Sequence, residues 1–271
     1  MLSALTFALV PGVVRVGHIR VSVFGFIAAA GLIAAIWLSQ YAARWAGVAA
    51  QKLWDAGVFA VLAAFVSSRA VLVAGDPNAF LHYPLLVLSL PSLTYGGVGL
   101  TAVAVLVYLR VVKLPLRATL DAWTAPAMVL GAVLALAHFV EGTDAGMPTS
   151  LPWGVHTPGD TIFGRVQPVQ IYLLLAALLI GLDALRVLRQ RHPMGLVAAR
   201  GLLFGGLSFF VLDMLAQPTD TQGGAWLDPG QWVALGCIAA GCAMLMMLLP
   251  ARARAASFAI EMDETNVKEH V

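Results

Sequence analysis

A few ionisable residues lie inside long apolar stretches of the chain, where a charged or polar side chain needs an explanation. Burying a charged side chain at the centre of a bilayer costs at least ~2.5 kcal/mol, so such residues mark candidate functional sites. Arg69 follows the apolar residues 58–66. Its guanidinium has the shape to bind a phosphate in an internal cavity, or it can snorkel to the membrane surface. His138 can act as a base or serve as an ordinary interfacial histidine.

Four aspartates also lie within or at the ends of apolar segments. Asp55, Asp121 and Asp183 are close to basic residues in the sequence, and we expect helix capping or pairing with a neighbour to account for them. Asp213 lies toward the other end of its segment. It is therefore the better candidate to face Arg69.

The chain contains none of the common catalytic signatures: no G-x-S-x-G, no H-E-x-x-H and no Walker loop. Its two cysteines, Cys237 and Cys242, share one apolar segment away from any histidine in sequence, which excludes a cysteine–histidine nucleophile. We expect no metal and no cofactor. Sixteen basic residues against 14 acids also give no sign of a nucleic-acid partner.

The composition assigns the chain to the integral membrane proteins. The 271 residues are 60% hydrophobic and 11% charged, with a mean hydropathy of +0.87, whereas soluble domains are roughly 25% charged. A membrane helix needs ~20 mainly apolar residues, and seven stretches qualify. They are residues 21–41, 53–74, 93–112, 118–140, 169–187, 198–215 and 231–249.

The basic residues predict the orientation of these seven helices. Twelve of them fall on one side: Arg44, Lys52, Arg110, Lys113, Arg117, Arg186, Arg189, Arg191, Arg200, Arg252, Arg254 and Lys268. Only Arg15, Arg20 and Arg165 fall on the other. The positive-inside rule then places the N-terminus outside and the C-terminus in the cytoplasm. We expect an outer-face N-terminal segment (1–20), an all-α transmembrane bundle (21–250) and a disordered cytoplasmic tail (251–271).

The long connections on the predicted outer side carry short motifs in a distinctive order. Residues 148–154 read Pro-Thr-Ser-Leu-Pro-Trp-Gly, and residues 167–172 read Gln-Pro-Val-Gln-Ile-Tyr. Further motifs are residues 22–25, 67–69, 94–97, 121–126, 135–146, 193–195, 216–218 and 230–232. In this order and spacing the chain resembles the bacterial prolipoprotein diacylglyceryl transferase family, seven-helix enzymes of the inner membrane. Residues 121–126 resemble the family's Asp-x-x-x-x-Pro helix start.

The resemblance implies a reaction and a set of site residues. In the family, a prolipoprotein cysteine thiol attacks the glyceryl carbon of phosphatidylglycerol and displaces glycerol phosphate. The implied partners are a phosphatidylglycerol-like phospholipid and a lipoprotein precursor or other membrane subunits. The implied catalytic residues are His138 and Tyr95. The implied substrate-binding residues are Arg69, Gly96, Gly97, Gly142, Gly146, Gln170, Tyr172 and Arg165.

The chain departs from the family pattern where that pattern supplies charge. Ala135 and Ala216 stand in place of arginines, and Tyr95 and Gln167 in place of histidines. His138 replaces an asparagine or cysteine, and Phe24 a tyrosine. One lost charged contact costs ~2–4 kcal/mol of transition-state stabilisation, so losing two predicts a rate lower by several orders of magnitude. Arg165 is the nearby candidate for a second cation.

Three interpretations therefore remain open. The chain is a divergent transferase that uses His138 as base and Arg69 for the phosphate, or a relative with changed chemistry on a lipid, or a non-catalytic lipid-binding or structural subunit. A second cation beside Arg69 would favour the first.

The predicted topology can be measured with reporter fusions. A reporter fused after Pro250 should give a cytoplasmic signal, and one inserted in residues 141–168 a signal from the outer compartment, because the basic loops stay inside. A cytoplasmic signal from the second fusion would contradict seven crossings.

Overall fold

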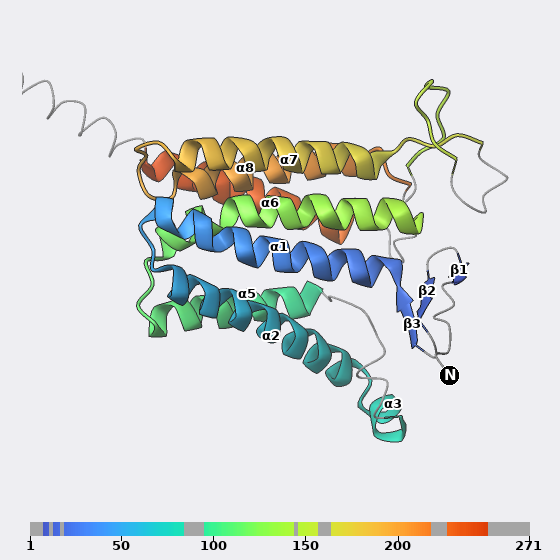
Figure 1. Cartoon of the computed structure of the whole chain (residues 1–271), viewed down its shortest axis with the longest axis horizontal. Helices are drawn as coiled ribbons and strands as arrows, with labels where there is room; N and C mark the ends of the chain where they lie inside the picture. Colours follow the sequence, from blue (N-terminus) through green and yellow to red (C-terminus); the bar gives the residue numbers. More distant parts are fainter. Residues whose placement is uncertain are drawn as a thin grey trace, which may run out of the picture.

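The computed structural model describes residues 8–10, 13–16, 19–83, 95–143, 146–156, 164–217 and 227–248, most of them in long apolar helices that run side by side (Figure 1). These are α1 (Val23–Ala46), α2 (Ala50–Gly75), α5 (Tyr95–Val111), α6 (Leu116–Glu141), α7 (Val169–Leu188), α8 (Leu196–Asp213) and a last helix, Pro229–Leu248. Within the described residues, six are long and apolar enough to cross a membrane.

The helical membrane body predicted from the sequence is thus confirmed, and each predicted segment corresponds to one helix. The exception in length is α5, whose apolar part, Gly96–Val111, is shorter than the other six. α6 begins at Leu116, two residues before the predicted segment 118–140, and it includes both Asp121 and Pro126.

Three short strands and one short helix were not predicted. β1 (Ala8–Val10), β2 (Val13–Val16) and β3 (Ile19–Ser22) form an antiparallel sheet in that order, and β3 leads directly into α1. α3 (Pro77–His82) follows α2. The sheet occupies much of the predicted N-terminal segment 1–20, while the predicted tail 251–271 lies outside the described residues.

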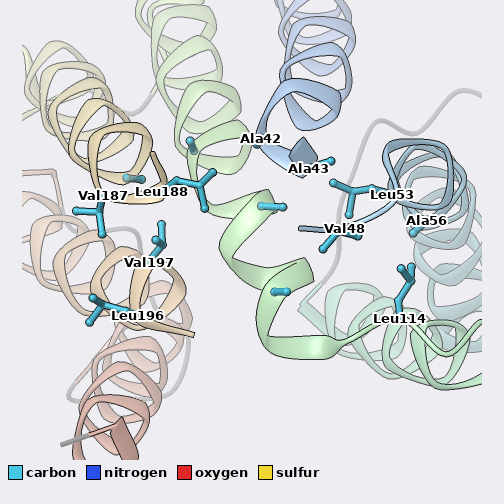
Figure 2. Packing of buried hydrophobic residues seen from close by; sticks show 14 of the residues in the cluster. Ala42, Ala43, Val48, Leu53, Ala56, Leu114, Val187, Leu188, Leu196 and Val197 are labelled. Atoms are coloured by element: carbon cyan, nitrogen blue, oxygen red, sulfur yellow. The ribbon is translucent and has the colours of Figure 1, made fainter. Parts of the chain in front are cut away.

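The main cluster of buried apolar residues lies at one end of the bundle (Figure 2). It is built from the C-terminal ends of α1, α5, α7 and the last helix and from the N-terminal ends of α2, α6 and α8. Alanine is frequent in it, as at Ala42, Ala43 and Ala56, and small side chains let membrane helices approach closely. From this end α2 diverges from α1 toward its own C-terminus (Figure 1).

Polar contacts reinforce the same end. Asp121 on α6 is 1% exposed. Its carboxylate accepts hydrogen bonds from the backbone N–H groups of Gly195 (2.6 Å) and Ala198 (2.8 Å), so it caps the N-terminus of α8. On the neighbouring helix pair, Asp183 forms an ion pair with Arg200 at 2.9 Å.

The capping and pairing predicted for the three aspartates near the basic side is therefore confirmed. Asp55 is the simplest case, since it accepts a hydrogen bond from Gln51 at 3.1 Å, one helical turn away. Asp121 instead reaches a helix more than 70 residues along the chain.

Substituting Asp121 tests how much this cap contributes. Asp121→Ala leaves two buried N–H groups of α8 without their acceptor, and hydrogen bonds to charged groups contribute ~1.5–3 kcal/mol each. We expect a clear drop in the thermal midpoint in detergent. Asp55→Ala, which removes an exposed carboxylate, should change it little. Equal midpoints for the two variants would contradict a structural role for the cap.

Candidate functional site

The predicted site residues that the structure describes lie toward the helix ends that are opposite the buried core cluster. Arg69 lies in the C-terminal half of α2, and Gly96 and Gly97 begin α5. His138 lies in the last turn of α6, and Tyr172 in the first turn of α7. Successive helices run in opposite directions, so these helix ends lie on the same side of the bundle, with α2 diverging from α1 toward its C-terminus (Figure 1).

Two hydrogen-bond donors of the Arg69 guanidinium lack an acceptor among the described residues. Its Nε and Nη1 atoms are buried and have no hydrogen-bond partner among the described residues. The guanidinium carbon lies 5.2 Å from the ring centroid of Phe65, a cation–π contact within α2. A buried donor left unpaired costs ~1–3 kcal/mol. Whether Arg69 binds an anion or snorkels stays a prediction.

The hydroxyl of Ser68 adds a second unsatisfied group next to Arg69. Ser68 is buried, and its Oγ has no hydrogen-bond partner among the described residues. Val71, two residues beyond Arg69, lies beside Gly96, where an added Cβ would come within 3.3 Å of Val71 Cγ1. The start of α5 therefore packs against the segment of α2 that carries Arg69.

His138 is fixed by α1 and by the turn that ends α6. Its ring packs edge-on against Phe24, with ring centroids 4.8 Å apart. Its Nδ1 lies 2.9 Å from Thr143 Oγ1, whose hydroxyl donates to the His138 carbonyl at 3.5 Å. If the Thr143 hydroxyl donates to that carbonyl, its oxygen accepts from a protonated Nδ1, and Nε2 is then the basic nitrogen. Thr143 was not predicted, because its contact depends on the turn at Gly142.

Two of the predicted substrate-binding glycines have structural reasons to be glycine. Gly142 ends α6 with φ 75°, the left-handed conformation that favours glycine. Gly146 pairs with Ala216 in a β-bridge, and a Cβ there would collide with the carbonyl oxygen of Gln167. A substrate contact for either glycine stays a prediction.

Residues 146–156 and 164–168 form a segment that we call the strap, which joins the ends of α6, α7 and α8. Met147 N–H donates to the Leu215 carbonyl at 2.8 Å, and Gln167 N–H donates to the Met147 carbonyl at 3.0 Å. Thr149 N–H donates to the carbonyl of Arg165 at 2.8 Å. The backbone of Arg165 is thus part of the strap, and its side chain is exposed.

Trp153 of the strap contacts Tyr172, one of the predicted site residues. Its indole Nε1–H donates to the hydroxyl oxygen of Tyr172 at 2.7 Å. Gln170, two residues earlier on α7, is 9% exposed. Trp153 was missed as a functional candidate, although it lies in the Pro-Trp-Gly motif.

The structure also shows where the residues lie that stand in place of the family's arginines and histidine. Ala135 is 6% exposed on α6, one helical turn before His138, so a longer side chain there would enter the helix bundle. Ala216 lies just after α8 and pairs with Gly146. Tyr95 begins α5, but its side chain lies outside what the structure describes. An approach of Asp213 to Arg69 stays a prediction.

The long apolar helices of the described residues define a multi-pass helical membrane protein, and one of them, α2, carries a partly buried arginine in its C-terminal half. The family model for prolipoprotein diacylglyceryl transferase matches residues 11–247. The chain therefore belongs to the prolipoprotein diacylglyceryl transferase family.

Curated relatives agree over most of their length. A phosphatidylglycerol–prolipoprotein diacylglyceryl transferase of Nitrosomonas europaea is 29% identical over 87% of this chain and 88% of its own. The protein of the same name from Cupriavidus pinatubonensis is 28% identical over 90% of this chain and 93% of its own. With six apolar spans and bacterial relatives, the chain is a multi-pass protein of the bacterial inner membrane.

Proposed function

We propose that this chain transfers the diacylglyceryl group of a phosphatidylglycerol-like phospholipid to the cysteine thiol of a lipoprotein precursor. The observation that supports this most is the guanidinium of Arg69, whose buried Nε and Nη1 have no protein acceptor among the described residues. A phosphate diester is an anion of the right shape to accept from both. Family membership gives the reaction type.

In this proposal each described group has one task. Arg69 binds the phosphate and stabilises the charge that grows on it as glycerol phosphate leaves. His138 Nε2 takes the thiol proton, with the ring held by Thr143 and Phe24. The thiolate sulfur attacks the glyceryl carbon that carries the phosphate ester, the C–O bond breaks, and the electron pair leaves with glycerol phosphate.

We further propose that α5 is a seventh crossing, with the N-terminus outside and the C-terminus in the cytoplasm. α5 packs against α2, and its apolar part falls only slightly short of the other spans. This orientation places Arg69, His138 and Tyr172 toward the outer leaflet. The segments 1–20, 21–250 and 251–271 then form an outer-face segment, the membrane body and a cytoplasmic tail. The reporter fusions described above test the orientation.

The same proposal predicts a slow enzyme. With Ala135 and Ala216 in place of arginines, the proposed phosphate site has Arg69 as its cation. The other candidate, Arg165, is exposed on the strap. Purified protein given phosphatidylglycerol and a lipobox peptide should form thioether at a rate several orders of magnitude below that of its arginine-containing relatives. Mass analysis of the peptide measures this.

Restoring the charge provides the sharper comparison. Arginine at both 135 and 216, combined with Tyr95→His, should raise the rate, while the two arginines without Tyr95→His should not. Arg69→Ala in either background should abolish product and serves as the control. Robust thioether formation by the unaltered chain would contradict this set of phosphate contacts. Binding of phospholipid without any transfer, even after restoration, would support the non-catalytic interpretation instead.

A further inference from the structure

Backbone hydrogen bonds of the strap form a turn that fixes the position of Trp153. Gly154 N–H donates to the Leu151 carbonyl at 3.0 Å, and Leu151 N–H donates to Thr149 Oγ1 at 3.2 Å. On the far side of the turn, Val155 and Val166 exchange backbone hydrogen bonds of 3.0 and 2.8 Å. The side chain that the turn presents to α7 is Trp153.

The contact that Trp153 makes has a defined direction. An indole N–H can only donate, so in the 2.7 Å hydrogen bond the hydroxyl oxygen of Tyr172 is the acceptor. The hydroxyl proton of Tyr172 must therefore point away from the indole. Among the described residues, the Tyr172 hydroxyl has no hydrogen-bond partner besides the indole. Accepting a hydrogen bond also makes a hydroxyl a better donor.

We propose that Trp153 is a positioning residue that makes the Tyr172 hydroxyl a hydrogen-bond donor to a phosphate oxygen of the phospholipid. This inference rests on the proposed function and adds a neutral donor where Ala135 and Ala216 supply no charge. Trp153 itself remains 57% exposed, as is common for a tryptophan at a membrane surface, where the ring meets lipid and the N–H meets a polar group.

A double-mutant cycle on lipid binding tests the proposal. Trp153→Phe, Tyr172→Phe and the double variant are placed in nanodiscs of phosphatidylglycerol or phosphatidylcholine, and retained lipid is measured by native mass spectrometry. If Trp153 acts through Tyr172, all three variants should lose phosphatidylglycerol retention by the same ~3–10-fold. Trp232→Phe, which changes a tryptophan 61% exposed on the last helix, should have no effect.

Other outcomes are equally informative. Losses that multiply in the double variant, or a loss with Tyr172→Phe alone, would overturn the positioning role. Trp153→His, which keeps a ring N–H, should restore part of the retention that Trp153→Phe loses, and a purely structural role for the indole would not give this rescue. Because retention is measured without turnover, absence of thioether product would count against the proposed transferase and leave this result unaffected.

Discussion

The buried carboxylate of Asp121 connects α6 to the first turn of α8 at the end of the bundle where most helices meet. In an apolar surrounding an unpaired carboxylate is costly, so this contact fixes the relative position of the two helices. Around it, small side chains such as Ala122 and Ala125 let the neighbouring helices approach. The other end of the bundle is thereby left to loops, the strap and polar side chains.

The buried apolar cluster therefore lies at one end of the bundle, and the candidate site residues lie toward the other. The site end contains groups whose hydrogen-bonding capacity the described protein does not fill, above all Nε and Nη1 of Arg69 and Oγ of Ser68. Thr143 contacts His138 on α6, and Trp153 contacts Tyr172 on α7. A phospholipid phosphate would satisfy the unfilled donors. That the family has arginines at the positions of Ala135 and Ala216, and that this chain has therefore lost charge there, stays a prediction.

The sequence predicted the helices well because long apolar runs are a local signal that packing does not override. It did not predict β1–β3 or α3, which are short. Arg69, His138 and Tyr172 were predicted as site residues from residue type and motif, and their roles stay predictions. Their partners could not be predicted, because Thr143 depends on a left-handed glycine and Trp153 on a strap closed by backbone hydrogen bonds. The capping of α8 by Asp121 was predicted only as capping in general, since its partner is distant in sequence.

The central claim is that Arg69 binds the phosphate of a membrane lipid. The most direct measurement compares phosphatidylglycerol retention by Arg69→Ala and Asp183→Ala in detergent, with native mass spectrometry as the readout. Asp183 is a suitable control because it pairs with Arg200 in the half of α7 nearer the buried core. The account predicts that Arg69→Ala loses at least about tenfold in retention, in line with the loss of a charge-assisted contact, while Asp183→Ala retains lipid normally. Equal losses in the two variants would contradict it.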